Sequence, residues 1–145
     1  MNQPDQSMAS SIERSVIRLH CAPAPDGLPV QAAEMFCQQF IQTLAENSKR
    51  SVIRRVPADQ TEPNGDTEVS ITLTIDGPQE AHLSARKGPQ GEQIDGASHS
   101  FDASMASASP RKLKAFADAL LKSAPEVGAL LRDATNTNPQ PEEKN

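Results

Sequence analysis

The stretch that decides the fold is Ser15–Leu44, "SVIRLHCAPAPDGLPVQAAEMFCQQFIQTL". Its opening residues are rich in β-branched side chains and alternate in polarity, which predicts a strand over 15–21. Three prolines and a glycine then break regular structure. From Pro29 onward apolar residues recur at helical spacing. This spacing predicts an amphipathic helix over roughly 29–47.

The same stretch holds both cysteines of the chain, Cys21 and Cys37. Cys21 has the apolar parity of the strand and Cys37 lies in the apolar stripe of the helix, so both face the interface between them. Two interpretations stay open: two reduced, buried thiols, or a disulfide that links helix to strand. The spacing is not C-x-x-C, which disfavours redox chemistry. A metal site is disfavoured too, because His20 and His82 have the opposite parity.

The remaining sequence alternates between strand and helix patterns. Apolar and polar residues alternate cleanly in "EVSITLTI" and "EAHLSAR", which predicts a hairpin with one face toward solvent. Ser109 followed by a proline predicts the start of a second helix. The further predicted elements are strands over 51–57, 68–75, 80–86 and 98–105 (the last one weaker and at an edge), a helix over 110–123, and a short helical piece from 125.

This β-α-β-β-β-β-α order predicts an α+β fold. We expect a two-layer, mainly antiparallel sheet of four to five strands, with the two main helices on one face. The first two strands flank a helix, so we expect them to be parallel neighbours joined by a right-handed crossover. The 145 residues predict one domain over 15–131, preceded by a flexible segment, 1–14, and followed by a disordered tail, 132–145.

Charge and composition argue against several classes of partner. The formal net charge of −5 disfavours nucleic acids and anionic membranes, which bind basic surfaces. The chain has no Trp, no Tyr and four Phe, so it lacks the aromatic platforms on which bases stack. No apolar stretch is long enough for a membrane span. The predicted partner is therefore a protein, and the lean core favours homodimerisation.

The cellular compartment that we infer for the protein depends on whether the two cysteines form a disulfide. The first residues contain no apolar run that resembles a signal peptide, which indicates a cytoplasmic protein as the sequence stands. A disulfide would point instead to a periplasmic or secreted protein whose signal peptide had been removed.

The polar parity of the strands predicts a candidate binding surface on the sheet face turned away from the helices. This surface is rich in hydroxyl groups and contains no large apolar side chain. Its simplest interpretation is a solvated face, and the sharper one is a docking surface or an edge for β-pairing with another chain. The predicted surface comprises Arg18, His20, Ser70, Thr72, Thr74, His82, Ser84 and Arg86.

A second candidate is a small basic patch in the first turn of the helix over 110–123, formed by Arg111, Lys112 and Lys114. The helix dipole disfavours cations in this position by about 0.3–1 kcal/mol each. Either an acidic partner neutralises the patch, or the side chains are solvated and the helix tolerates the cost.

The sequence carries no recognisable catalytic or cofactor motif. It contains no G-x-S-x-G elbow, P-loop or dinucleotide fingerprint, so no cofactor is predicted. On a strand His99 points away from Ser98 and Asp102, which prevents a catalytic relay, although its phase with Phe101 suggests a partly buried imidazole. We therefore predict a non-enzymatic binding module. The alternatives are a disulfide-stapled periplasmic or secreted domain with an envelope-related binding role, and a small enzyme that uses His99 and loop carboxylates.

Overall fold

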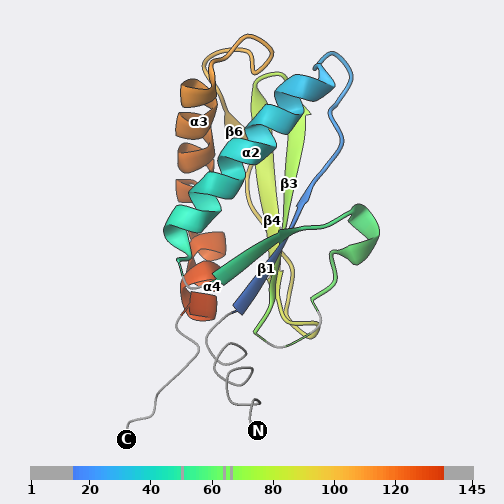
Figure 1. Cartoon of the computed structure of the whole chain (residues 1–145), viewed down its shortest axis with the longest axis vertical. Coiled ribbons are helices and arrows are strands. Elements are labelled where there is room, and N and C mark those ends of the chain that lie inside the picture. Colours follow the sequence, from blue (N-terminus) through green and yellow to red (C-terminus); the bar gives the residue numbers. More distant parts are fainter. Residues whose placement is uncertain (1–14, 50, 64, 66, 136–145) are drawn as a thin grey trace, which may run out of the picture.

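The computed structural model describes residues 15–49, 51–63, 65 and 67–135 as an α+β fold of two layers (Figure 1). The expected flexible segment 1–14 and residues 136–145 of the expected tail lie outside the described residues. The elements are, in chain order, β1 (Ser15–Cys21), α2 (Val30–Asn47), β2 (Ser51–Arg55), η1 (Ala58–Gln60), β3 (Val69–Gly77), β4 (Glu80–Lys87), β5 (Ile94–Asp95), β6 (His99–Ser100), α3 (Pro110–Lys122) and α4 (Pro125–Thr135).

The six-stranded sheet has the order β2-β1-β3-β4-β5, and β6 also pairs with β4. β1 is parallel to both of its neighbours, β2 and β3. β4 is antiparallel to β3, β5 and β6. The predicted α+β class, the parallel first pair and the hairpin are therefore confirmed. The sheet is mixed rather than mainly antiparallel, because β3 joins the free side of β1 in parallel instead of pairing with β2.

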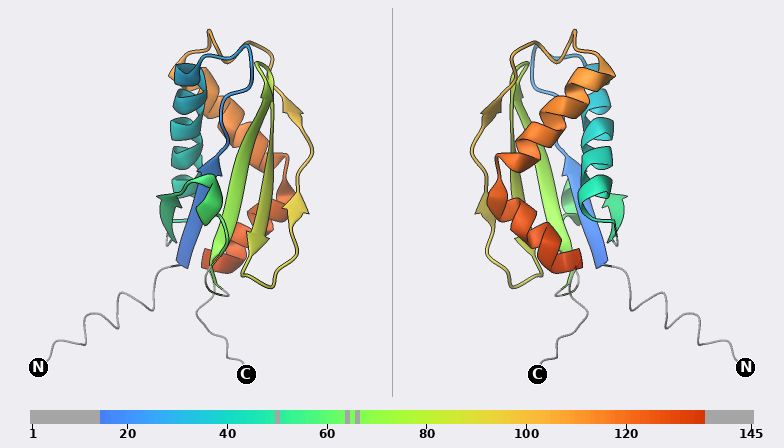
Figure 2. Two further views of the ribbon diagram at one scale, coloured as in Figure 1. Left: turned by 90° about the vertical axis from the view of Figure 1, so that its right-hand side faces the viewer. Right: turned by 90° about the vertical axis from the view of Figure 1, so that its left-hand side faces the viewer.

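The core lies between the inner face of the sheet and the helices. Figure 2 shows the strands and η1 in front of α3 and α4 in its left panel, and α3 and α4 in front in its right panel, so α3 and α4 lie on the side of the sheet opposite to η1. The inward-facing apolar side chains of the strands pack against the apolar faces of the helices, as the alternation in the sequence predicted. The largest fully buried side chains are Ile17, Leu19, Phe36, Phe40, Leu44, Ile71, Leu73, Leu83, Met105, Leu113, Leu120 and Leu131.

Phe116 of α3 joins three segments of the chain through its ring. The ring stacks on Phe36 of α2 at a centroid distance of 5.1 Å and on Phe101 at 4.6 Å. His99 of β6 stacks on the same ring at 5.7 Å. The predicted, partly buried position of His99 thus has a packing explanation, since the imidazole covers an aromatic ring at the margin of the core.

The weak strand predicted over 98–105 is much shorter than expected. β6 contains only His99–Ser100. The backbone N–H groups of Phe101 and Met105 donate instead to carbonyl groups of the β3–β4 turn, at 2.6 and 2.8 Å. The alternation in this segment reflects side chains that insert into the core, not a continuous ladder. The two-residue strand β5, Ile94–Asp95, was not predicted because it is too short to produce a periodic pattern.

Cys21 and Cys37 form a disulfide that ties the end of β1 to the middle of α2. Their Cα atoms lie 6.2 Å apart, and 16 positions separate them in the sequence. The Cys37 side chain is buried and that of Cys21 is half-buried. The structure therefore favours the disulfide over the pair of reduced thiols.

We expect the disulfide to stabilise the fold because it restricts the conformations that the unfolded chain can adopt. Replacing both cysteines with alanine should lower the free energy of unfolding by about 3 kcal/mol for a loop of this length. Urea unfolding followed by circular dichroism measures this change, with the reduced wild-type protein as a matched control. Equal unfolding midpoints for the oxidised wild type and the double variant would contradict the expectation.

A surface ion pair joins α2 to the edge strand β2. The Arg55 guanidinium donates to both carboxylate oxygens of Glu34, at 2.5 and 2.8 Å. Gln38 donates a further hydrogen bond to the same carboxylate at 3.0 Å. The hydrogen bonds from Arg55, and then that from Gln38, lower the pKa of Glu34 from 4.5 to about 2. The paired geometry fixes β2 beneath the helix that precedes it.

The ion pair should make stability depend on pH in acid. Because the pKa of Glu34 is lower in the folded than in the unfolded chain, its contribution is complete above pH 4.5 and is lost as the pH falls toward 2. Glu34→Gln should remove that part of the pH dependence. Both side chains are well exposed, so we expect less than about 1 kcal/mol, and less in high salt. Urea unfolding of both proteins from pH 2 to 6 tests this, and parallel curves would contradict it.

Candidate functional site

The structure brings the predicted surface residues together in rows across the outer face of the sheet, the face away from the helices. In one row Ser70 of β3 lies between Arg18 of β1 and Arg86 of β4. The next row contains His20, Thr72 and Ser84. The row after it contains Thr74 and His82. The parity argument therefore placed all eight side chains on one side of three adjacent strands.

The outer face of β1 is covered by the chain that connects β2 to β3. We call this connection, residues 56–68, the crossover loop. Arg18 Nε donates to Glu68 Oε1 at 2.9 Å, and Arg18 Nη1 donates to the Gln60 carbonyl at 3.3 Å. His20 Nδ1 lies 3.0 Å from the Val56 carbonyl, a contact in which the ring nitrogen carries the proton.

The covering loop changes which predicted residues are accessible. Arg18 is 9% exposed and Ser70 is 8% exposed, so neither lies on an open surface. Arg18 therefore anchors the crossover loop. The partly exposed members of the predicted surface on β3 and β4 are Thr72, Thr74, His82, Ser84 and Arg86. The sequence did not indicate this cover, because the loop carries no periodic pattern and its contacts join residues far apart in the chain.

A small pocket lies beside the crossover loop on the outer face of β3 and β4. Its volume is about 130 Å³. The hydroxyl groups of Ser70, Thr72 and Ser84 make no hydrogen bond to another residue in the part of the chain that the structure describes. These hydroxyl groups can therefore donate to and accept from a ligand. The pocket is lined by Thr61, Glu62, Ser70, Thr72, Ser84, Ala85, Arg86 and Gln93.

Charged side chains flank this pocket along the two strands. Arg86 pairs with Glu62 of the crossover loop, with Nη2 2.5 Å from Oε1. At the other end of the surface, His82 Nδ1 lies 2.9 Å from Asp76 Oδ2, and the Ser98 hydroxyl donates to the same oxygen at 3.1 Å. The pairing of Asp76 with His82 was not predicted, although the hairpin register that places Thr74 opposite His82 would have indicated it.

The geometry of these groups does not match a nucleophilic relay. The Ser98 hydroxyl contacts the carboxylate of Asp76, not an imidazole that could accept its proton. His99 stacks on the Phe116 ring. These contacts of Ser98 and His99 are not those of a catalytic triad, and the strand over 98–105 on which the sequence argument relied is limited to His99–Ser100.

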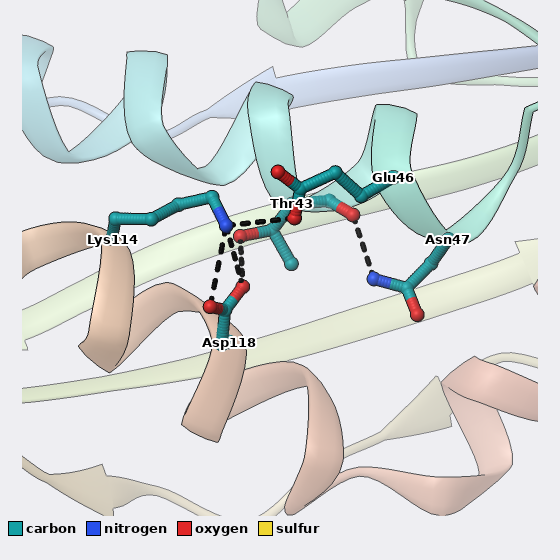
Figure 3. A network of polar contacts seen from close by, with 5 residues as sticks. All are labelled: Thr43, Glu46, Asn47, Lys114 and Asp118. Carbon is teal, nitrogen blue, oxygen red and sulfur yellow. Dashed lines mark hydrogen bonds and ion pairs between the residues drawn. The ribbon is translucent and has the colours of Figure 1, made fainter.

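The three residues of the predicted basic patch do not share one environment. Ser109 caps α3 by accepting from the Lys112 N–H at 3.2 Å, as predicted. Arg111 and Lys112 are exposed, but Lys114 is held by two carboxylates. Its ammonium donates to Glu46 at 2.7 Å and to Asp118 at 3.0 Å (Figure 3). These hydrogen bonds, that to Glu46 first, raise the pKa of Lys114 above its usual value.

The contacts of Lys114 belong to a polar network that joins α2 to α3. The buried Thr43 hydroxyl donates to Asp118 Oδ1 at 2.8 Å, and Asn47 Nδ2 donates to the Thr43 carbonyl at 2.8 Å. Figure 3 shows Lys114 and Asp118 of α3 directed toward Thr43 and Glu46 of α2. Lys114 thus has a structural role between the helices.

A second hollow adjoins this network where α2, α3 and α4 meet. Its volume is about 740 Å³. Its walls combine charged and apolar side chains. The lining residues are Glu46, Asn47, Asp118, Leu121, Lys122, Pro125, Gly128 and Leu131.

Residues 15–49, 51–63, 65 and 67–135 contain no group of three or more His, Cys, Asp or Glu side chains that would hold a metal ion. None of the helices in the same ranges is long and apolar enough to cross a membrane.

Comparisons with protein-family models, with curated proteins and with solved structures find no match to this chain.

The ion pair between Arg18 and Glu68 should hold the crossover loop on β1. Glu68→Gln leaves the Arg18 guanidinium, whose side chain is 11% exposed, without its carboxylate. We expect the free energy of unfolding to fall by about 1–3 kcal/mol. We also expect faster amide exchange at Val56, whose N–H donates to the Leu19 carbonyl of β1, and at Gln60, whose N–H donates to the Pro57 carbonyl.

Glu62→Gln is the matched control for this experiment, because it alters a glutamate of the same loop whose side chain is 66% exposed. Its effect on stability should stay within about 0.5 kcal/mol. If both variants change stability and exchange to the same extent, Arg18 does not anchor the loop in the way argued.

Proposed function

We propose that this chain is a non-enzymatic binding module that captures a protein partner on the outer face of β3 and β4. The observation that carries the proposal is the pocket in this face, where three hydroxyl groups are free of partners in the described part of the chain. Interfaces between proteins include direct hydrogen bonds between polar side chains and have a polar rim. Here Arg86 with Glu62, and His82 with Asp76, supply polar groups beside the pocket.

The composition supports a protein rather than a nucleic acid or a sugar as the partner. The chain has no Trp and no Tyr, and the four Phe include Phe36, Phe101 and Phe116, which stack with one another in the interior. Among the residues that the structure describes, no aromatic side chain lines the pocket. Base and sugar recognition relies on such rings, whereas β-sheet faces with hydroxyl groups suit polar side chains of another protein.

The experiment is capture of binding proteins from cells of the source organism on the immobilised chain, followed by affinity measurement with the captured protein. Thr72→Ala combined with His82→Ala should weaken binding by about five- to 150-fold, since each lost hydrogen bond is worth about 0.5–1.5 kcal/mol. Thr72→Ser keeps a hydroxyl group and should bind nearly as the wild type does.

Two control variants make the result specific to this face. Gln42→Ala changes an exposed side chain of α2 on the other side of the molecule and should leave affinity unchanged. Arg111→Ala combined with Lys112→Ala tests the exposed part of the basic patch. Loss of affinity in the basic-patch variant, with none in the Thr72 and His82 variant, would move the binding site to α3 and refute the proposal.

A second candidate function is a periplasmic or secreted domain with an envelope-related binding role. The disulfide between Cys21 and Cys37 favours it, because such bonds persist in oxidising compartments. Alkylation of the protein in intact cells of the source organism, followed by intact-mass measurement, tests this candidate. No alkylation is expected, and two alkylated thiols would refute it.

A further inference from the structure

The pocket on β3 and β4 is equipped to receive an acceptor of hydrogen bonds. Arg86 is the only cationic side chain that lines it in the described part of the chain. Its guanidinium can donate two parallel hydrogen bonds to a carboxylate. The hydroxyl groups of Ser70, Thr72 and Ser84 lie in the adjacent positions of the two paired strands and can donate as well.

Glu62 shows how a glutamate side chain reaches this guanidinium. It comes from the crossover loop and its carboxylate oxygen lies 2.5 Å from Arg86 Nη2. The Glu62 side chain is 66% exposed, whereas that of Arg86 is 27% exposed. Ion pairs with an exposed partner are held weakly, so another carboxylate can take the place of Glu62.

The size of the pocket limits what it can take. A volume of about 130 Å³ corresponds to roughly four water molecules. It lies below the range of about 300–1,000 Å³ that is typical of pockets for whole small molecules. The pocket therefore suits one side chain of a larger partner.

We propose that this pocket receives a glutamate side chain of the partner protein, whose carboxylate replaces that of Glu62 on Arg86. The inference rests on the function proposed above and adds the chemical class that the outer face recognises. Glu62 then acts as an internal competitor: the loop carboxylate occupies Arg86 in the free protein and is released when the partner binds.

The test uses the full chain labelled with ¹⁵N and four tripeptides as probes. Acetylated and amidated Ala-Glu-Ala, Ala-Gln-Ala and Ala-Lys-Ala differ in the charge of one side chain, and acetylated Ala-Gln-Ala with a free carboxyl end offers a terminal carboxylate instead. The amide signals of Ser70, Thr72, Ser84 and Arg86 report on the pocket. Saturable shifts at these amides are expected with the Glu peptide, and at least tenfold weaker binding with each of the other three.

Two variants connect the signal to the pair of Arg86 and Glu62. Arg86→Gln should abolish the saturable shifts. Arg86→Lys should retain part of the affinity, because lysine keeps the positive charge but cannot donate two parallel hydrogen bonds to one carboxylate. Glu62→Gln should tighten binding of the Glu peptide several-fold, because it removes the competitor. A gain of affinity cannot arise from misfolding, so this variant keeps the test decisive.

Several results would overturn the inference. These are equal binding of the Gln peptide, preferred binding of the Lys peptide or of the free carboxyl end, and unchanged affinity of Glu62→Gln. The outcome is separable from that of the proposed function. If partner capture depends on Thr72 and His82 but the Glu peptide gives no saturable shifts, the proposed binding face is supported and the proposed carboxylate pocket is refuted. If the Glu peptide binds but partner capture does not depend on Thr72 and His82, carboxylate binding by the pocket is supported and the proposed partner-binding face is refuted.

Discussion

The position of β1 between two parallel neighbours is the constraint on which the rest of the structure depends. A chain that runs in parallel from β1 to β2, and then from β2 to β3, must cross the sheet twice in opposite directions. Connections of the same hand that run in opposite directions lie on opposite faces, and parallel connections strongly favour one hand. The helix α2 makes the first crossing on the inner face, and the crossover loop makes the second on the outer face.

The two crossings give the two faces of the sheet different roles. On the inner face, α2 is fixed to β1 by the disulfide and, with α3 and α4, closes the core. On the outer face, the loop covers β1 through Arg18 and ends against β3, so β4 and part of β3 stay accessible. The accessible strands are those of the hairpin, where polar side chains alternate outward. The candidate binding surface is thus what the second crossing leaves uncovered.

Local patterns in the sequence predicted most of the architecture. Alternation located the long strands, and helical spacing located α2 and α3. Parity placed Cys21 and Cys37 on a common buried side, and Thr72 and Ser84 on the outer face. Parity decides on which face a side chain lies, but it does not decide which strands are neighbours. The parallel addition of β3 to β1, and hence the mixed sheet, depends on contacts between distant parts of the chain.

The same limit explains what was missed in the candidate site. Arg18 was assigned to an open face because its contacts with Glu68 and with the Gln60 carbonyl join residues 50 and 42 positions apart, which no local pattern connects. Lys114 was assigned to a basic patch because its partner in α2, Glu46, is 68 positions away. Each of these contacts requires the packing of complete elements. Polar side chains are therefore placed on a face by the sequence, but their partners are fixed only by the tertiary fold.

The central claim is that the outer face of β3 and β4 is the binding surface of this protein. Amide hydrogen exchange of the whole chain, measured with and without its captured partner, tests the claim most directly. The account predicts added protection in β3, in β4 and in the crossover loop, with α2 and α3 unchanged. Protection confined to α2, α3 or α4, with no change in the β3–β4 hairpin, would contradict it.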